Sequence, residues 1–367
     1  MKIIICTNST WNLVNFRSEL IMALVATGHE VVAVAPYDKY SVRLEALGCK
    51  FVELKMDNAG TSPVQDALLL LRFWRLLRRE QPGVFLGFTV KPNVYGSLAS
   101  HRLGIPVINN VAGLGAVFIK GGWLAQLVQG LYRAALGQSA KVFFQNPDDR
   151  QLFLDGRLVK ANVTDLLPGS GIDLNRFAVA PMSAANSKFR FLLIARMLRD
   201  KGVVEFVQAA KMLRDRWPSV EFCLLGFVDV QNPEAISRAE VERWVAQGFV
   251  NFLGVSDDVR NEIAIADCVV LPSYREGTPR SLLEAAAMGR PIITTDAVGC
   301  REVVDHGVNG YLCKVRDAED LAEKMNQMLF LSAENRIAMG LRGRAKMEAE
   351  FDEKIVIGKY LAAIEAI

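Results

Sequence analysis

The chain has 367 residues, of which 51% are hydrophobic and 23% charged, so it can bury a large core and is not intrinsically disordered. The formal net charge of +3 is too small to indicate nucleic-acid binding. Three histidines and six cysteines scattered singly argue against a structural zinc site. The length favours two domains, and no apolar stretch reaches the roughly 18 residues of a membrane-spanning helix.

Charge is distributed unevenly along the chain. Residues 1–180 carry 19 Lys or Arg and 13 Asp or Glu, a net of +6, whereas the remainder carries 24 against 27, a net of −3. From Gln81 to Pro147 there is no acidic residue, although basic ones are present. This stretch could face an anionic ligand or an anionic membrane surface, or it could reflect only a buried sheet.

In the first half, short β-rich runs alternate with helical patterns. Residues 2–6 (KIIIC) predict a buried strand, a helix is expected over about 15–28, and residues 30–36 predict a second strand. The segment SVRLEALG predicts a short helix that ends at Gly48. Further strands are expected at VFLGF, PVINN and KVFFQ.

The same rhythm restarts after residue 188. A strand at 189–195 leads into a helix from about Gly202, and further strands are expected at 221–226, 250–254, 267–273, 291–296 and 310–314. Apolar strands separated by helices indicate parallel sheets covered on both faces. Residues 166–188, rich in Pro, Gly, Ser and Ala, are typical of a crossover between two such units. Ligands are expected at the carboxyl ends of the strands.

The segment EGTPRSLLEAAAMGRP (276–291) follows one of these strands. Thr278 is expected to cap a helix that begins at Pro279. The free amides of Arg280, Ser281 and Leu282 would then form, with the helix dipole, an anion site suited to a diphosphate.

Two carboxylates flank this expected anion site. Each can accept two hydrogen bonds from vicinal hydroxyls, so we assign Glu284 to a ribose and Glu276 to a transferred sugar. Taken singly, Glu284 could be a solvated helix acid, and Glu276 could be a loop acid that offsets the helix dipole.

The Glu-x7-Glu pattern resembles the signature of retaining glycosyltransferases of family 4. ARMLRDKG (195–202) is similar to another family segment and keeps Arg196 and Lys201, although Ala195 replaces the usual first Gly. LLPGSGIDLNRF (166–177) resembles the family's crossover, with Ser170 where Asn is usual. CLLGFVD (223–229) and NFLGVSDDV (251–259) resemble strand-end loops beside the nucleotide base, which makes Gly226 and Gly254 expected donor contacts. The resemblance covers essentially the whole chain.

This resemblance implies an α/β protein of the GT-B fold, with two Rossmann-like parallel-sheet domains facing across a cleft. Residues 1–167 would bind the acceptor, with a C-terminal helix at 352–367 packing back on them, and residues 168–351 would bind the donor. Arg196, Lys201 and Glu276 would be the catalytic residues. Arg196 and Lys201 would stabilise the leaving diphosphate as fixed cations, and Glu276 would position the hydroxyls of the sugar. The expected donor contacts are Gly277, Thr278, Pro279, Arg280, Ser281, Leu282 and Glu284, with Gly226 and Gly254.

Within the family, NSTWNLVNFRSEL (8–20), FTVKPNVYGSLAS (88–100), PVINNVAGLG (106–115) and VGCRE (298–302) resemble bacterial enzymes that extend polyprenyl-diphosphate-linked sugars. The group that adds N-acetylgalactosamine or a similar sugar is the most similar. The resemblance implies a UDP-sugar donor, a polyprenyl-diphosphate saccharide acceptor, retention of configuration, and no metal or other cofactor. The absence of Asp-x-Asp from the sequence agrees with metal independence.

Acceptor contacts are harder to assign from the sequence. Arg17 and Lys91 could hold an acceptor diphosphate, or they could be ordinary surface cations. Asn93, Asn110 and the Gly113-Leu114-Gly115 loop could shape the acceptor site or simply turn the chain.

Two helical segments suggest contact with a membrane surface. ALLLLRFWRLLRRE (67–80) places Arg72, Arg75 and Arg79 at helical spacing, and residues 118–136 add Trp123, Leu124 and Tyr132. Such helices can lie on an anionic leaflet or simply cover a sheet. We expect a cytoplasmic protein, peripheral on the inner face of the plasma membrane; the oligomeric state stays open.

Three other functions fit the sequence less well. A sugar-nucleotide epimerase of similar two-domain build would need acid–base groups, and His29, His101 and His306 are badly placed to form a set. A dehydrogenase would need Gly-x-Gly-x-x-Gly after a strand, which the sequence lacks. A non-catalytic peripheral membrane binding protein would not need Arg196, Lys201 and both glutamates together.

Overall fold

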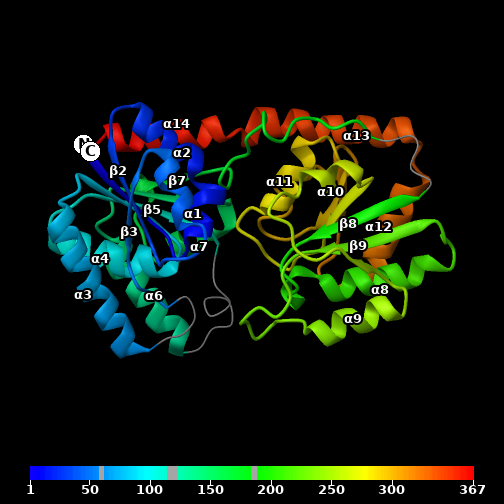
Figure 1. Cartoon of the computed structure of the whole chain (residues 1–367), viewed down its shortest axis with the longest axis horizontal. Helices are drawn as coiled ribbons and strands as arrows, with labels where there is room; N and C mark the ends of the chain where they lie inside the picture. The colour runs from blue at the N-terminus through cyan, green and yellow to red at the C-terminus, as the bar shows by residue number, and fades with distance from the viewer. Residues whose placement is uncertain (58–61, 114–122, 183–187) are drawn as a thin grey trace. The chain divides into compact units, whose positions relative to one another are not determined.

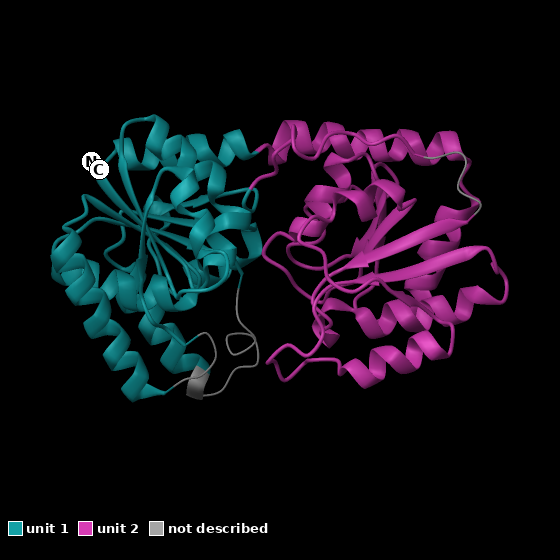
Figure 2. Cartoon of the chain, viewed as in Figure 1, with its two compact units in different colours: residues 1–170, 353–367 teal, residues 171–352 magenta. Residues whose placement is uncertain are grey.

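The computed structural model describes residues 1–57, 62–113, 123–182 and 188–367. These residues form two compact units, residues 1–170 with 353–367 and residues 171–352 (Figure 2). The sequence places the boundary between 167 and 168, and the contacts divide the chain between 170 and 171. Each unit is a parallel sheet with helices packed on it (Figure 1), the α/β class that the apolar strands predict.

The first unit is built on seven described strands in the order β3-β2-β1-β4-β5-β6-β7. They are β1 (Lys2–Cys6), β2 (Glu30–Ala35), β3 (Lys50–Glu53), β4 (Val84–Phe88), β5 (Val107–Val111), β6 (Lys141–Phe144) and β7 (Thr164–Leu166). The described helices are α1 (Thr10–Phe16), α2 (Ser18–Ala26), α3 (Pro63–Glu80), α4 (Ser97–Arg102), α6 (Trp123–Leu136), α7 (Pro147–Asp155) and α14 (Glu353–Glu365). All five residues of β4 and of β5 are buried, because both faces of the sheet are covered.

Two local expectations for this unit need correction. The helix expected over about 15–28 is two helices, α1 and α2, which meet at Arg17, where the backbone leaves helical geometry. The segment SVRLEALG forms two 3₁₀ turns, Ser41–Arg43 and Glu45–Leu47, because a run this short cannot sustain α-helical hydrogen bonds.

The C-terminal helix α14 belongs to the first unit. Tyr360 of α14 is fully buried, its ring lies 5.0 Å from Phe143 and 5.8 Å from Phe88, and its hydroxyl accepts a hydrogen bond from Asn110 at 2.8 Å. The end of the chain therefore completes the core of the unit in which the chain begins.

The second unit has six described parallel strands in the order β10-β9-β8-β11-β12-β13. They are β8 (Phe189–Ile194), β9 (Val220–Leu225), β10 (Asn251–Phe252), β11 (Cys268–Leu271), β12 (Ile292–Thr295) and β13 (Gly310–Cys313). The helices are α8 (Val203–Arg214), α9 (Arg238–Ala246), α10 (Arg260–Ile265), α11 (Arg280–Ala287), α12 (Ala318–Phe330) and α13 (Ala333–Lys346). Because β8 lies between β9 and β11, the loops that follow these three strands are neighbours.

Two arginines fasten the crossover segment to this unit. Arg290 is fully buried and donates to the carbonyl oxygens of Ala180 at 2.8 Å and Ile263 at 3.0 Å. Arg344 donates to the carbonyl oxygens of Phe177 and Ala287, each at 2.9 Å. A guanidinium has five donors, so one side chain can satisfy carbonyls from several loops.

Candidate functional site

The carboxyl ends of β8 and β11 bring a cation and a carboxylate together. Lys201, in the 3₁₀ turn Arg199–Lys201 after β8, donates from Nζ to Oε1 of Glu276 at 2.5 Å. Both side chains are mostly buried, with 14% and 16% of their surface exposed. The two residues are 75 positions apart in the sequence, and the parallel pairing of β8 with β11 is what places them together.

The turn that carries Glu276 is held on several sides. The hydroxyl of fully buried Ser273 lies 2.8 Å from Glu276 Oε1 and 3.1 Å from the carbonyl oxygen of Asp200. The amide of Tyr274 donates to the same Asp200 carbonyl at 2.9 Å, and its hydroxyl donates to Glu205 at 2.6 Å. These contacts fix the orientation of the Glu276 carboxylate relative to the turn after β8.

Gly299 supports the same turn from the loop after β12. Its φ of +84° is the left-handed region that favours glycine. A Cβ at this position would lie 2.3 Å from the Glu276 carbonyl oxygen and 2.4 Å from that of Gly277. The VGCRE segment thus has a packing role beside Glu276, whose amide donates to the Val298 carbonyl at 2.9 Å.

The helix after this turn begins one residue later than expected. Pro279, not Thr278, is the N-cap of α11, and Arg280 is its first residue. Pro279 has ψ of 112°, outside the helical range, and its own side chain makes no capping hydrogen bond. The amide of Leu282 donates to the Pro279 carbonyl at 3.1 Å, so the expectation that this amide is free is wrong. The tighter first turn uses that amide internally.

Glu284 lies one turn along α11 and pairs with an arginine of the same helix. Arg280 Nε donates to Glu284 Oε1 at 3.0 Å, and 17% and 13% of the two side chains are exposed. Burial raises the pKa of Glu284, and the neighbouring charge of Arg280 opposes the rise. The site therefore holds a second mostly buried carboxylate whose charge is balanced by a cation.

Gly226 and Gly254 lie where the loops after β9 and β10 meet. The amide of Gly226 donates to the Gly254 carbonyl at 2.8 Å. Gly226 has φ of +147°, and a Cβ there would lie 1.8 Å from the carbonyl oxygen of Ala195. Only glycine allows the loops after β8 and β9 to approach so closely.

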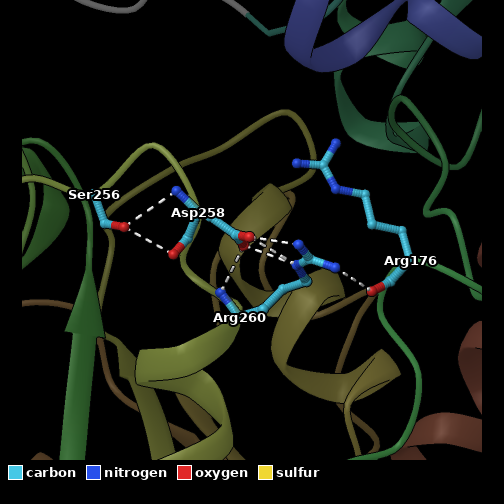
Figure 3. A network of polar contacts seen from close by, with 4 residues as sticks. All are labelled: Arg176, Ser256, Asp258 and Arg260. Atoms are coloured by element: carbon cyan, nitrogen blue, oxygen red, sulfur yellow. Dashed lines mark hydrogen bonds and ion pairs between the residues drawn. The ribbon is translucent and has the colours of Figure 1, made fainter.

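The loop that runs from β10 into α10 carries a compact polar network (Figure 3). Arg260 donates to Asp258 from Nε at 2.8 Å and from Nη2 at 2.5 Å, and its hydrogen bonds lower the pKa of Asp258 to about 2. Nη1 of Arg260 also donates to the carbonyl oxygen of Arg176 at 3.4 Å. In Figure 3 the guanidinium of Arg176 points away from this network.

Arg196 lies two residues after the end of β8 and is exposed. It forms no ion pair with another described residue, whereas Lys201 is committed to Glu276. An exposed cation at a strand end can turn toward an arriving anion at little cost, because no existing contact must be broken.

In the first unit, Arg17 is not the exposed cation that one interpretation of the sequence allowed. Only 4% of it is exposed, and its guanidinium lies 4.3 Å from the centre of the Phe88 ring. Burial raises the pKa of Tyr360 to about 12, and the positive charge of Arg17 opposes that rise. Arg17 is therefore a buried cation beside Phe88, the last residue of β4.

Lys91 and the two asparagines are engaged within the unit. Lys91 pairs with Asp66 of α3 at 3.0 Å. Asn93 is buried and donates to the Asn110 carbonyl at 2.7 Å, and Asn110 donates to Tyr360. These bonds tie β5, α14 and the π-helical turn Pro92–Gly96 together. Direct contact of Lys91, Asn93 or Asn110 with an acceptor stays a prediction.

Two more features lie at the ends of β4 and β5. Thr89 has φ of +66°, and its buried hydroxyl oxygen has no hydrogen-bond partner. A β-branched residue in this conformation is an outlier that the surrounding structure must hold in place. Gly113 has φ of +136°, whereas Leu114 and Gly115 of the same expected loop lie outside the described residues.

The three arginines that the sequence places at helical spacing on α3 differ in their contacts, and contact of this helix with a membrane stays a prediction. Arg72 donates to the Lys55 carbonyl at 2.7 Å, and Arg79 donates to Glu80 at 3.0 Å. Arg75 and Arg78 are exposed. The side chains of Trp123 and Leu124 lie outside the described part of the structure. None of the described helices is long and apolar enough to cross a membrane.

Several residues of this site are not among those that the sequence pattern indicated. Ser273, Glu205 and Asp200 contact the turn that bears Glu276, and Arg176 and Arg260 lie by the Gly254 loop. Asp200 lies inside the segment 195–202 that the resemblance singled out, and Ser273 is the last residue of the strand expected at 267–273, which were the only signals for them. In the described residues, no three His, Cys, Asp or Glu side chains are grouped so that they could hold a metal ion.

Comparisons with known protein families agree with this two-unit organisation. The glycosyl transferase 4-like domain matches residues 15–169, and the family of glycosyl transferases group 1 matches residues 188–330. The two matches lie one in each unit.

Individual relatives span the whole chain or most of it. The N,N'-diacetylbacillosaminyl-diphospho-undecaprenol alpha-1,3-N-acetylgalactosaminyltransferase of Campylobacter jejuni is 28% identical over 100% of this chain and 99% of its own length. The UDP-Gal:alpha-D-GlcNAc-diphosphoundecaprenol alpha-1,3-galactosyltransferase of Escherichia coli is 23% identical over 70% of this chain and 69% of its own.

The crystal structure of Anabaena HepE in complex with UDP and glucose superposes with a TM-score of 0.79 over 100% of both chains, at 18% identity. At that identity the likeness establishes the fold. The chain therefore belongs to the glycosyltransferases that join a glycosyl transferase 4-like domain to a glycosyl transferases group 1 domain on the GT-B fold.

Proposed function

We propose that this glycosyltransferase moves a sugar, an N-acetylhexosamine, from a UDP-sugar to a polyprenyl-diphosphate-linked saccharide, with retention of configuration. In this proposal the acceptor is an intermediate of bacterial surface glycan assembly. The names of the Campylobacter jejuni and Escherichia coli relatives support a diphospho-undecaprenol-linked acceptor, and the latter supports a UDP-sugar donor. The HepE complex with UDP and glucose supports the same donor class.

The observation that carries the proposal is the pair of balanced carboxylates beside the start of α11. Glu276 is held by Lys201, and Glu284 is held by Arg280. A nucleotide-sugar offers one diphosphate and two polyols, and this site offers cations and two carboxylates along one helix start. We assign Glu284 to the ribose and Glu276 to the transferred sugar.

The chemistry requires stabilisation of negative charge on the leaving diphosphate. Lys201 would leave Glu276 for that diphosphate as Arg196 turns toward it, and the amides at the start of α11 would complete the anion site. Loss of one such fixed donor typically costs about 2.7–4 kcal/mol, or a factor of about 100–1,000 in rate. Glu276, released from Lys201, would then orient the sugar hydroxyls and stabilise the positive charge that develops on the sugar ring.

Retention and metal independence are parts of this proposal. The acceptor hydroxyl would attack on the face that the diphosphate leaves, and a phosphate oxygen would take its proton, so the site needs no protein nucleophile. We propose no metal, because Arg196 and Lys201 would supply the positive charge that the leaving diphosphate needs.

Product analysis tests the transfer directly. The purified chain is incubated with UDP-N-acetylgalactosamine, UDP-N-acetylglucosamine or UDP-galactose and a synthetic polyprenyl-diphosphate N-acetylhexosamine, with and without a chelator. The proposal expects acceptor-dependent release of UDP that survives the chelator, and an α-linked product. A β-linkage, or activity that requires added metal, would contradict the corresponding part.

Paired variants test the two glutamates. Glu284→Ala should weaken UDP binding measured by calorimetry, because it removes the ribose contact. Glu276→Gln should lower turnover far more than UDP affinity. The reverse pattern would show that the two assignments are exchanged.

We also propose that the protein is cytoplasmic and lies on the anionic inner face of the plasma membrane through α3. Exposed Val64, Leu68, Leu71, Arg75 and Arg78 recur at helical spacing along it. Apolar and basic side chains on one stripe suit an anionic leaflet, where each basic group contributes about 1 kcal/mol.

Vesicle co-sedimentation tests this location. We expect binding to vesicles that contain phosphatidylglycerol, with loss of binding in high salt and in Arg75→Gln with Arg78→Gln. Arg72→Gln is the matched control, because Arg72 is already bonded to a backbone carbonyl. Equal binding to neutral vesicles would contradict an electrostatic attachment.

A further inference from the structure

Ser273 presents one proton to two acceptors. The residue is fully buried after β11, and its Oγ lies 2.8 Å from Glu276 Oε1 and 3.1 Å from the Asp200 carbonyl oxygen. A hydroxyl has a single donor hydrogen, so it can serve only one of these oxygens at a time. The geometry therefore contains two hydrogen-bonding states that differ by rotation of one hydroxyl.

Glu276 has a second contact at the same oxygen. Lys201 Nζ lies 2.5 Å from Oε1, so this one carboxylate oxygen receives both a cation and the Ser273 hydroxyl. A bound diphosphate would compete for Lys201, because phosphate oxygens are strong acceptors for a charged donor. Glu276 would then lose its counter-charge and be free to turn toward the sugar.

The Asp200 carbonyl can take the hydroxyl proton when Glu276 turns away. A carbonyl oxygen has two lone pairs, and this one already accepts the Tyr274 amide at 2.9 Å. With the second lone pair available, the buried hydroxyl has an acceptor in both states. Without it, movement of Glu276 would leave a buried donor unpaired, which opposes the movement.

We propose that Ser273 is a positioning residue for the transfer reaction. Its hydroxyl holds the Glu276 carboxylate against Lys201 before the donor binds, and it passes its hydrogen bond to the Asp200 carbonyl when Glu276 engages the donor sugar. The inference rests on the proposed role of Glu276 and adds the residue that sets where its carboxylate points.

Ser273→Ala tests the proposal in the full-length chain, with UDP-N-acetylgalactosamine and a synthetic polyprenyl-diphosphate N-acetylhexosamine as probes. The Asp200 carbonyl keeps the Tyr274 amide in this variant, so folding should survive. We expect kcat to fall about tenfold, the size of one lost hydrogen bond to a charged group, with UDP affinity unchanged. Ser273→Cys, which keeps a weak donor in similar volume, should retain an intermediate kcat.

Thr294→Val is the matched control. Thr294 is equally buried and its hydroxyl donates to a backbone carbonyl, that of Leu271 at 2.7 Å, but it has no hydrogen bond to Glu276. This variant should keep the wild-type kcat. A loss of kcat equal to that of Ser273→Ala would overturn the proposal, because it would show a general effect of removing buried hydroxyls.

A double-mutant cycle separates positioning from simple structural support. If Ser273 acts through Glu276, Ser273→Ala should add little to the loss that Glu276→Gln already causes. Multiplicative losses, or wild-type kcat in Ser273→Ala beside a slow Glu276→Gln, would overturn this inference alone. Wild-type kcat in Glu276→Gln would instead refute the proposed role of Glu276, and the inference with it.

Discussion

Gly299→Ala is expected to displace the turn that carries Glu276. A Cβ at Gly299 would lie 2.3 Å from the Glu276 carbonyl oxygen, and Cβ atoms in proteins essentially never come closer than 3.0 Å to such a neighbour. The obstructing atoms belong to the backbone, so the turn itself must move, by about 0.7 Å.

Two effects follow from this substitution. An alanine in the left-handed region costs roughly 1–2 kcal/mol, which lowers Tm by about 2–8 °C in a unit of this size. The displacement adds a loss of activity, because a shift near 1 Å at a reacting group can lower the rate about 100-fold. We expect turnover to fall about 10- to 100-fold, since the shift is somewhat smaller.

Gly307→Ala separates the two effects. Gly307 belongs to the same unit and has φ of +77°, but a Cβ there meets no atom within 4 Å. Its variant should show the loss of Tm with wild-type turnover. Thermal melting and acceptor-dependent UDP release measure both quantities in both variants. The reasoning would be refuted if Gly299→Ala matched Gly307→Ala in both.

Three further predictions concern charge, pH and strain. Arg196→Ala and Lys201→Ala should each lower turnover about 100-fold or more. Because both side chains serve one diphosphate, the double variant should lose far less turnover than the product of the two single fold-losses. A loss equal to that product would contradict a shared role. Burial raises the pKa of Glu284 above its usual 4.5, so the folded state binds the Glu284 proton more tightly than the unfolded state does. As pH rises from 4.5, the Tm of the wild type should therefore fall relative to the Tm of Glu284→Gln. Parallel Tm curves from pH 4.5 to 8 would contradict this. Thr89→Gly should relieve backbone strain, so Tm should rise by a few degrees, and the acceptor KM should rise as well. Gln81→Gly is the control: Gln81 has φ of +48° at the αL C-cap of α3, and its replacement should raise Tm alone. An unchanged acceptor KM in Thr89→Gly would show that the strained residue has no functional role.

Local patterns predicted the elements of this fold well because burial on both faces makes strands continuous apolar runs. KIIIC is β1 residue for residue, and the helix expected from about Gly202 begins at Val203. The two-unit GT-B fold followed from the repeated rhythm and the family resemblance. A short polar segment carries less information, which is why the break at Arg17 and the cap at Pro279 were missed.

Side-chain pairing within the site could not be predicted in the same way. The contact of Lys201 with Glu276 depends on the order of strands in the sheet, and no local spacing encodes it. Lys91 and Arg17 are likewise recognisable as cations in the sequence, but only the structure shows that Lys91 pairs with Asp66 and that Arg17 lies over Phe88. Whether a charged residue is available to a ligand is decided by partners that lie far away in the chain.

The placement of α14 makes the second unit an insertion within the first. The two ends of the inserted segment lie together, since the amide of Ile172 donates to the Phe351 carbonyl at 2.9 Å and Ile172 pairs with Asp352 as a β-bridge. Domains whose termini are adjacent tolerate excision and transplantation. We therefore expect residues 171–352 to fold as a separate fragment, with both cuts made at one place. The first unit allows no such truncation, because ending the chain at residue 170 would remove Tyr360 and leave the Asn110 amide without its partner.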